Sequence, residues 1–399
     1  MKIDWQRKAD PKGVADATSL LVRSSGLEDC SGLESWVEPP GAASRASEQE
    51  QHERLRDALA AAEPTTPDDD RSEMKENVLA GARTGLAKVN QGEPPENFTL
   101  GEHIGLESVI LTDGTRPSLI VRNGFVDLQA PDVGDWSMGL NRFQNEIRKV
   151  TTSVGRIDIP VSPWFEGTCF VISEGLVLTN RHVLEAIAKR DAAGAWTLNW
   201  PDATTIDFVG EDGVATATKF KVVGVAFAGP NAINNTVNFV HLDIAVMRVD
   251  PASDTATPFP KAVTFEADVA QPKADRNLYV LGFPGKPNVW LFEGQPPTGS
   301  ETAQVLSTLF NNKFGTKRLA PGVIKAGPGQ VANDAQKWIC THDASTLGGN
   351  SGSCVVDLDQ DGFRIIGSHF AGANRGQNWA HVAARLQDYL ANLSATFVA

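Results

Sequence analysis

The sequence has few cysteines, and nothing in their spacing favours a metal site or a redox pair. Only four occur among 399 residues, at Cys30, Cys169, Cys340 and Cys354. They form no C-x-x-C pair, and no histidine stands at zinc-ligand spacing from them. We therefore expect free thiols, no bound metal and no cofactor.

The chain also lacks a long hydrophobic run and an excess of positive charge. Its first ten residues, M-K-I-D-W-Q-R-K-A-D, are too polar for a signal peptide, and no run approaches the ~18 apolar residues of a membrane-spanning helix. The formal net charge is -13. Because polyanions bind to basic surfaces, this charge argues against nucleic acid as a partner. We expect a cytoplasmic protein with no membrane partner.

The first 70 residues are predicted to form an N-terminal arm or small interaction domain that ends in a linker. Residues 47–62 are rich in helix formers and favour a helix. The stretch P-T-T-P-D-D-D at residues 64–70 ends this helix, because proline lacks the backbone N–H that a helix interior needs.

Residues 71–154 form a second predicted segment, with helices and one hairpin. Apolar residues at helical spacing predict helices over residues 72–89 and 98–111. The Asn-Gly dipeptide at residue 123, between two strand-like runs, predicts a hairpin turn. A further helix is predicted over residues 141–154.

From residue 155 onward the sequence consists of short β-rich runs cut by glycine, proline, asparagine and aspartate. The runs are C-F-V-I-S, G-L-V-L-T, F-K-V-V-G-V-A-F, D-I-A-V-M-R-V, N-L-Y-V-L-G-F and F-R-I-I-G-S-H-F. This pattern is typical of an all-β fold. A helix with apolar residues every four positions is predicted over residues 379–393. Residues 155–399 are therefore predicted to form one domain.

The motif T-N-R-H-V places His182 directly after the strand-like run G-L-V-L. A histidine at the end of a strand is held rigidly and stays exposed, as a general base must be. A single histidine is more often an ordinary core or surface residue, so this motif alone does not define a site.

The motif H-L-D-I-A-V-M-R-V places Asp243 at the start of an apolar strand. A carboxylate loses hydration there unless a donor compensates, and an imidazole N–H would compensate while fixing the tautomer of the ring. An aspartate that only caps the strand is the alternative explanation.

The motif G-G-N-S-G-S contains a serine in a turn rich in glycine. The glycines allow a tight turn in which the N–H groups of Gly349 and Ser351 converge on one point and form an anion site. Sequence of this kind is also common in linkers. Its place between the strand-like runs K-W-I-C-T and C-V-V-D-L argues against a linker.

The chain order His182, Asp243, Ser351 is that of chymotrypsin-type peptidases. Residues 155–390 resemble a trypsin-like serine peptidase of the disulfide-poor bacterial kind, near the glutamyl endopeptidase-like branch. The matching stretches are G-T-C-F-V-I, T-N-R-H-V, D-I-A-V, G-G-N-S-G-S and G-S-H-F-A-G. The resemblance implies a mainly β fold of two packed antiparallel six-stranded β-barrels with a C-terminal helix, preceded by a mostly helical N-terminal region.

The resemblance also implies a role for each matching residue. Ser351 is expected to be the nucleophile, His182 the acid and base, and Asp243 the residue that orients the histidine. The N–H groups of Gly349 and Ser351 are expected to form the oxyanion hole. The implied activity is that of a serine endopeptidase, which cleaves proteins or peptides through an acyl-enzyme. A catalytically silent peptide-binding or scaffold protein on the same fold is the alternative.

Four residues match substrate-binding positions of the family: Thr346, His369, Phe370 and Gly372. In glutamyl endopeptidases the positions of Thr346 and His369 bind a substrate carboxylate, so the resemblance implies a preference for acidic residues. The stretch from His369 to Gly372 corresponds to the edge that pairs with the substrate backbone. Asn350 stands where trypsin has an aspartate, so we do not expect activation by an ion pair with a new N-terminus.

Residues 71–154 loosely resemble the leader that precedes such intracellular bacterial peptidase domains. Two interpretations stay open. The N-terminal region is either a regulatory or adaptor module, which docks a partner or holds the protease inactive, or a helical layer that completes the barrel.

Overall fold

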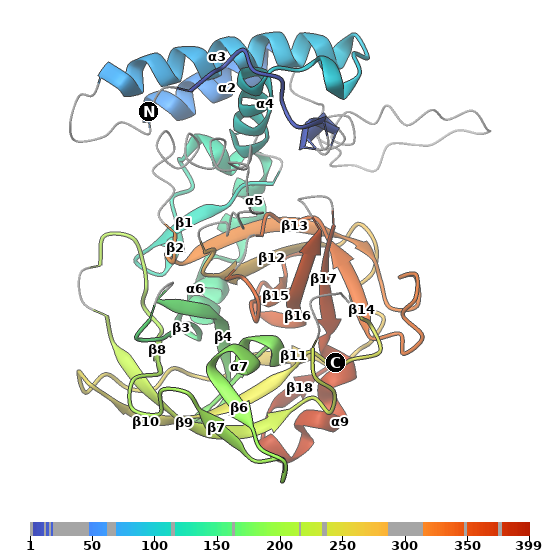
Figure 1. Cartoon of the computed structure of the whole chain (residues 1–399). Helices are drawn as coiled ribbons and strands as arrows, with labels where there is room; N and C mark the ends of the chain where they lie inside the picture. The colour runs from blue at the N-terminus through green and yellow to red at the C-terminus, as the bar shows by residue number, and fades with distance from the viewer. Residues whose placement is uncertain are drawn as a thin grey trace. The chain divides into compact units, whose positions relative to one another are not determined.

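A computed structural model describes residues 3–11, 13–15, 17–18, 48–61, 69–112, 116–161, 164–214, 217–233, 238–285, 314–346, 349–373 and 377–399 (Figure 1). These residues form two compact units. The first contains those up to Pro117 together with Gln129–Trp136. The second contains those of Ser118–Leu128, Ser137–Pro287 and Phe314–Ala399. The predicted segment 71–154 is therefore divided between both units.

The first unit is helical, as predicted. Its elements are α2 (Glu48–Ala61), α3 (Asp69–Asn90), η1 (Pro95–Asn97), α4 (Leu100–Thr112) and η2 (Pro131–Trp136). Helices α3 and α4 approach closely because glycine stands at their contact: a Cβ added to Gly81 would lie 2.1 Å from the carbonyl oxygen of Gly101. Leu55 and Val78 are among the apolar side chains that bury into one core. The predicted linker at residues 64–70 lies mostly outside the described residues.

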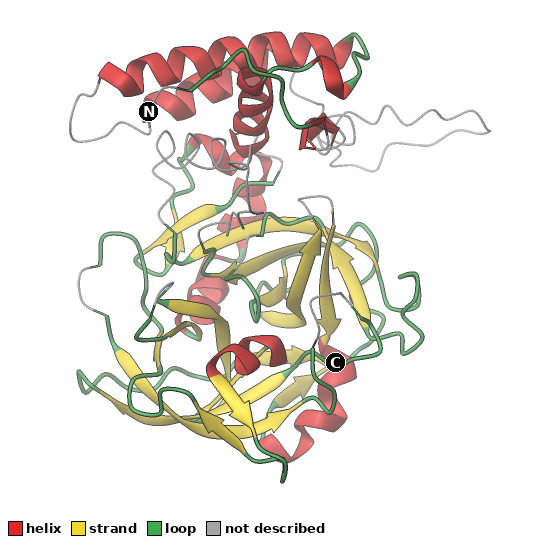
Figure 2. Ribbon diagram, viewed as in Figure 1, coloured by secondary structure: helices red, strands yellow, loops and turns green. Residues whose placement is uncertain are grey.

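The second unit is built mainly from strands, with short helices between them (Figure 2). Its helices and 3-10 turns are α5 (Ser137–Arg142), α6 (Gln144–Thr152), α7 (Arg181–Ile187), η3 (Ala383–Leu386), α9 (Gln387–Leu390) and η4 (Ala391–Leu393). Its strands are β1 (Leu119–Arg122), β2 (Phe125–Val126), β3 (Val154–Asp158), β4 (Phe165–Ser173), β5 (Leu176–Thr179), β6 (Ala188–Arg190), β7 (Trp196–Leu198), β8 (Thr205–Asp207), β9 (Lys219–Ala228), β10 (Ala245–Ser253), β11 (Thr264–Glu266), β12 (Asn277–Gly282), β13 (Arg318–Ala326), β14 (Ile339–His342), β15 (Cys354–Asp357), β16 (Arg364–Ala373), β17 (Gln377–Val382) and β18 (Thr396–Val398).

Two closed six-stranded antiparallel barrels form from these strands, which confirms the predicted fold class. The first barrel has the strand order β10-β5-β4-β3-β8-β9. The second has the order β12-β15-β16-β17-β14-β13, and pairing of β12 with β13 closes it. Phe208, Phe220 and Phe259 pack edge to face inside the first barrel, with ring centroids 5.2–5.6 Å apart. Aromatic and aliphatic side chains together form the core of the first barrel.

The predicted hairpin before the barrels is present and joins the second barrel. Asn123 and Gly124 connect β1 to β2 with φ angles of 52° and 76°, the left-handed turn that an Asn-Gly pair favours. β1 pairs on its other side with β13, with Leu119 opposite Leu319. The hairpin therefore extends the sheet of the second barrel.

Two predicted helices differ from the observed elements. The helix predicted over residues 379–393 begins only at Ala383, because Trp379 and Val382 lie in β17, which pairs with both β14 and β16. The helix predicted over residues 141–154 is two helices, since Phe143 between α5 and α6 has non-helical backbone angles. Ladder pairing and one local kink thus override helical periodicity.

The thiols of the described cysteines are buried and unpaired. Cys169, Cys340 and Cys354 are free, and Cys30 lies outside the described residues. Burial raises the pKa of the Cys169 thiol, and it raises the pKa of Cys340 and Cys354 to about 12. These thiols are therefore protonated at neutral pH and chemically inert.

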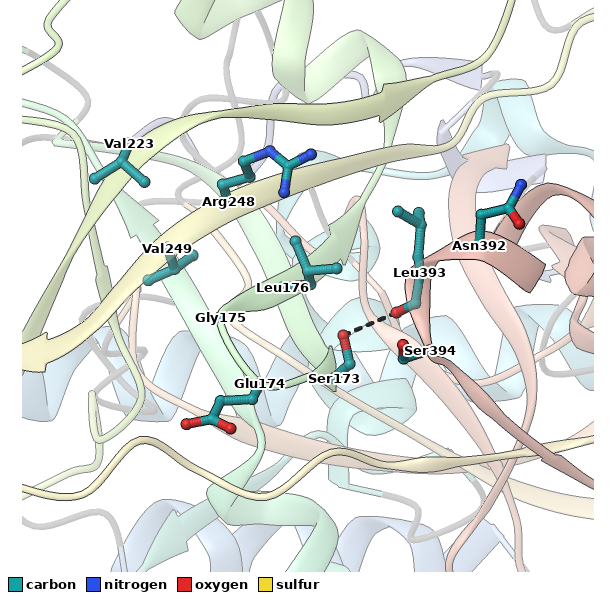
Figure 3. A pocket seen from close by; sticks show the side chains of 10 residues that line it. All are labelled: Ser173, Glu174, Gly175, Leu176, Val223, Arg248, Val249, Asn392, Leu393 and Ser394. Atoms are coloured by element: carbon teal, nitrogen blue, oxygen red, sulfur yellow. Dashed lines mark hydrogen bonds between the residues drawn. The ribbon is translucent and has the colours of Figure 1, made fainter.

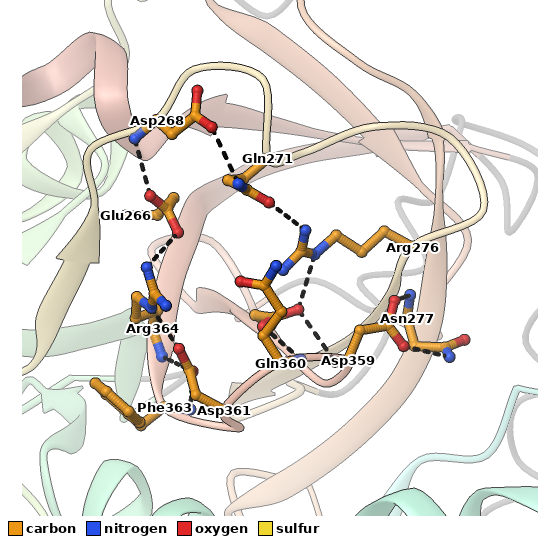
Figure 4. Close-up of polar contacts among 11 residues, drawn as sticks. Glu266, Asp268, Gln271, Arg276, Asn277, Asp359, Gln360, Asp361, Phe363 and Arg364 are labelled. Carbon is orange, nitrogen blue, oxygen red and sulfur yellow. Dashed lines mark hydrogen bonds and ion pairs between the residues drawn. The ribbon is translucent and has the colours of Figure 1, made fainter. Parts of the chain in front are cut away.

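A polar network fixes the turn between β15 and β16 (Figure 4). The turn has the sequence D-L-D-Q-D-G-F-R, and its carboxylates all have partners. Arg276 donates to Asp357 at 2.8 Å, and Asn277 donates twice to Asp359 at 2.9 and 2.7 Å. Arg364 pairs with the third carboxylate of the turn and with Glu266. No group of metal-ligating side chains suited to hold an ion occurs within the described part of the chain.

The described helices include none that is long and apolar enough to cross a membrane.

Candidate active site

His182 and Asp243 meet at one end of the first barrel. His182 stands in the first turn of α7, directly after β5, and Asp243 lies two residues before β10. The ring Nδ1 of His182 lies 2.6 Å from Asp243 Oδ2, and the backbone N–H of His182 donates to Asp243 Oδ1 at 2.9 Å. Asn180 donates its side-chain N–H to the Asp243 carbonyl at 2.9 Å. Both carboxylate oxygens thus hold the histidine.

The charge of Asp243 is stabilised by this contact. Burial raises the pKa of the Asp243 carboxyl, but the hydrogen bonds and charge of His182 outweigh burial, and the pKa lies below its usual value. Asp243 is therefore ionised at neutral pH. An ionised acceptor at Nδ1 places the proton there and leaves Nε2 of His182 free to accept one.

The turn formed by residues 349–353, here called the serine turn, carries Ser351 and is joined to both barrels. Thr168 of β4 donates its backbone N–H to the Ser351 carbonyl at 2.9 Å, and its hydroxyl donates to the Gly349 carbonyl at 2.8 Å. On the other side Gly352 donates to the carbonyl of His369 in β16 at 3.0 Å. The N–H groups of Gly349 and Ser351 donate no hydrogen bond within the described structure.

Two glycines of this turn cannot be replaced without strain. Gly349 and Gly352 have φ angles of +90° and +86°, in the region that favours glycine. A Cβ on Gly349 would lie 2.6 Å from the Phe283 carbonyl, and one on Gly352 would lie 2.1 Å from the Thr168 carbonyl. The prediction of a tight turn rather than a flexible linker fits this geometry.

Gly167 of β4 lies next to both the Ser351 backbone and Val183, the residue after His182. A Cβ added to Gly167 would lie 3.0 Å from the side chain of Val183, which follows His182, and 3.1 Å from the Ser351 carbonyl. No hydrogen bond between Ser351 Oγ and His182 Nε2 is formed in the described structure. The structure thus joins His182 to Asp243 directly and brings Ser351 to the strand beside them.

Thr346 and Gly372, two of the predicted substrate-binding residues, meet at Asn378 of β17. The Thr346 hydroxyl lies 2.5 Å from Asn378 Oδ1, and a Cβ on Gly372 would lie 2.4 Å from the same oxygen. The side-chain N–H of Asn378 donates to the carbonyls of His342 and Ala344. Sequence reasoning missed Asn378, because no motif connects β17 with the serine turn.

His369, the third of these residues, is buried beside another histidine. Its ring meets the His342 ring edge to face at 5.4 Å. Among the described residues, neither ring nitrogen of His342 nor Nδ1 of His369 has a hydrogen-bond partner. Burial lowers the pKa of His342 to about 3, and burial together with His342 and His182 lowers the pKa of His369 well below its usual value. Both rings are neutral at physiological pH.

Phe370, the fourth, packs behind the site. Its ring stacks on His381 with the ring centroids 4.5 Å apart and is buried, and its backbone lies in β16. His381 Nε2 accepts the backbone N–H of Asp243 at 3.1 Å. Burial lowers the pKa of His381 to about 4, although the charge of Asp243 opposes this shift. His381 was also missed from the sequence, where it is one polar residue in the strand-like run W-A-H-V.

The described structure has an open cavity of about 530 Å³ elsewhere on the second unit (Figure 3). It lies between the β4–β5 turn and η4, where Ser173 donates to the Leu393 carbonyl. None of the predicted site residues lines it.

The barrel pair and the histidine–aspartate contact define a trypsin-like serine protease. The family model described as trypsin-like peptidase domain matches residues 167–367, half of the chain, and the chain belongs to this family. It is 33% identical over 350 residues to a probable serine protease of Lysobacter enzymogenes, covering 84% of this chain and 87% of that protein. The protein is accordingly a serine protease.

Among solved structures, the chain is similar to the Rv3671c protease of M. tuberculosis. The match to the active form is 21% identical in sequence. It covers 62% of this chain and 83% of that chain, with a TM-score of 0.34. The match to the inactive form is 20% identical in sequence. It covers 63% of this chain and 93% of that chain, also with a TM-score of 0.34.

Proposed function

We propose that the protein is a serine endopeptidase in which Ser351, His182 and Asp243 form the catalytic triad. The observation that carries this proposal is the double hydrogen bond between His182 and Asp243, beside a serine turn that is bonded to both barrels. A buried carboxylate at Nδ1 sets the tautomer in which Nε2 accepts a proton from a serine hydroxyl.

The proposed reaction uses these groups in turn. His182 takes the Ser351 proton as Oγ attacks the scissile carbonyl, and the N–H groups of Gly349 and Ser351 stabilise the oxyanion. Protonated His182 then gives its proton to the leaving amine, which departs and leaves an acyl-serine. Water hydrolyses this ester with the same histidine as base. The bond between Ser351 and His182 is expected to form in the substrate complex, since such contacts are often long in free enzymes.

A fluorophosphonate probe, which reacts with activated serines, tests this assignment. We expect labelling of the wild type at Ser351, no labelling of Ser351→Ala and severe loss in His182→Ala. Ser353→Ala is the matched control, because Ser353 lies in the same turn and its buried hydroxyl has no partner among the described residues. Labelling of Ser351→Ala, or no labelling of the wild type either as the full chain or as a chain that begins at Ser118, would show that the triad is wrong and would favour the silent scaffold.

The acyl side of the substrate is proposed to carry an acidic residue before the scissile bond, as in the glutamyl endopeptidase-like branch. Thr346, Asn378 and His369 supply a hydroxyl, an amide and an imidazole beside the serine turn. A substrate carboxylate would favour the protonated form of His369. It would also accept hydrogen bonds from the buried ring, which the ring otherwise lacks. Paired peptides with Glu or Gln at this position test the preference, which should fall in His369→Gln and in Thr346→Val.

The N-terminal unit is proposed to be a regulatory or adaptor module that docks a partner or restrains the protease. The support is its separate helical core, which a packing layer for the barrel does not need. Activity of the full chain compared with a chain that begins at Ser118 tests this role. A rise in activity on truncation agrees with restraint, and an insoluble or unfolded truncated chain agrees with the packing layer.

A further inference from the structure

Glu166 is a carboxylate without a fixed partner beside the serine turn. It lies in β4 and is only partly exposed. Within the described structure it makes no hydrogen bond and no ion pair. Its two neighbours both face the turn: a Cβ on Gly349 would lie 3.0 Å from the Phe165 ring, and one on Gly167 would lie 3.1 Å from the Ser351 carbonyl.

A β-bulge places Glu166 at this point. In the pairing of β3 with β4, Ile157 faces Gly167 and Asp158 faces Phe165, so Glu166 has no residue opposite it. Bulges commonly turn one side chain toward an active site. Burial raises the pKa of the Glu166 carboxyl, and the charge of nearby His182 opposes this shift. The carboxylate is thus partly desolvated, and a further cation would stabilise it.

The position of β4 indicates which half of the substrate Glu166 meets. This step rests on the proposed function, in which the acyl half of the substrate lies along β16, beside Thr346 and His369. The serine turn is bonded to β16 through Gly352 and to β4 through Ser351. A substrate that crosses the nucleophile from β16 therefore carries its leaving half over β4. His182 must protonate the leaving amine, and its charge acts on Glu166 by lowering the pKa of that carboxyl.

We propose that Glu166 is a specificity-determining residue for the leaving half of the substrate. Its carboxylate forms an ion pair with a lysine or arginine in the first two positions after the scissile bond. The protease then selects sites by charge on both sides of the bond, with acidic residues before it and basic residues after it. A partly desolvated ion pair of this kind favours lysine over glutamate by about tenfold in kcat/KM.

Competition between peptides measures this selectivity independently of total activity. Quenched fluorescent peptides share one acyl half and carry Lys, Gln or Glu at the two positions after the scissile bond. The full-length wild type is expected to cleave the Lys peptide about ten times more efficiently than the Glu peptide. The ratio should approach one in Glu166→Gln and invert in Glu166→Lys. Glu174→Gln, on the exposed β4–β5 turn, should keep the wild-type ratio.

Two failures of this experiment are distinguishable. If the wild type cleaves the peptides with a ratio near one, or if Glu166→Gln keeps the wild-type ratio, the role of Glu166 is wrong and the proposed function stands. If neither the full chain nor a chain that begins at Ser118 cleaves any of them or takes up fluorophosphonate, both are wrong. Because each ratio comes from one sample, partial misfolding of a variant does not alter it.

Discussion

The backbone N–H of Asp243 donates a hydrogen bond of 3.1 Å to Nε2 of His381, 138 residues further along the chain. Asp243 belongs to the first barrel and His381 to β17 of the second. The acceptor exists only while His381 is neutral with its proton on Nδ1. The stacked ring of Phe370 and the edge of Trp338 hold the imidazole in place. The second barrel therefore positions the carboxylate that orients His182.

Substitution His381→Phe should lower catalysis without removing any proposed substrate contact. The Asp243 N–H would be buried without an acceptor, at a cost of about 1–3 kcal/mol. We expect kcat to fall about tenfold or more, with KM changed less than about threefold, because the orientation of His182 is affected more than binding. His381→Gln retains an acceptor and should recover part of the loss. Equal losses in the two variants would show that His381 only fills space.

Buried neutral histidines predict acid sensitivity of the fold. The folded-state pKa of His381 is about 4 and that of His342 about 3, whereas both are near 6.5 when unfolded. Below pH 6.5 the unfolded chain binds more protons, so the free energy of unfolding falls as the pH decreases from 6.5 toward 4. Each histidine should contribute a loss on the order of 3 kcal/mol. Urea unfolding at several pH values measures this slope.

Substitution His342→Phe separates this effect from packing. Both ring nitrogens of His342 are buried and have no partner within the part of the chain that the structure describes, so a phenyl ring loses no hydrogen bond seen there. We expect equal or greater stability at pH 7, by up to about 2 kcal/mol, and a smaller loss of stability in acid. A large loss of stability at pH 7 would show that His342 has a partner in solution. Cleavage after acidic residues should also weaken if His342 supports His369.

The hairpin at the start of the second unit should be needed for stability. Leu119, Val121 and Phe125 are buried, and β1 pairs with β13. A chain that begins at Val150 lacks these side chains, each worth about 1.5–3 kcal/mol on burial. It should therefore unfold at a lower temperature than a chain that begins at Ser118. Thermal unfolding of the two chains checks this, and equal midpoints would mean that the hairpin is dispensable.

Motif order and strand context predicted the barrels and placed His182 directly against Asp243. Those signals are local, because each proposed catalytic residue follows or precedes a recognisable strand. Asn378, His381 and Glu166 carry no such signal. Asn378 and His381 act through partners in other strands, and Glu166 depends on a bulge that a strand pattern does not show. The C-terminal helix began too early in the prediction because helical periodicity in residues 379–382 does not reveal that both edges of β17 are paired.

Substitution Gly352→Ala tests whether the turn must fit tightly against the first barrel. A Cβ there would lie 2.1 Å from the Thr168 carbonyl and 2.5 Å from the Thr179 hydroxyl, in addition to the cost of a φ of +86°. Gly213→Ala is the matched control, since its φ is +80° and nothing lies within 4 Å. The control should lose about 1 kcal/mol of its free energy of unfolding from backbone strain alone and keep full labelling by the fluorophosphonate.

The Gly352→Ala variant should lose most of the labelling. Its free energy of unfolding should fall by at least about 2 kcal/mol more than that of the control, because neither barrel atom can move without disturbing β4 or β5. If both variants label equally well, the contact between the turn and β4 does not position Ser351, and the hydrogen bonds from Thr168 are incidental to catalysis.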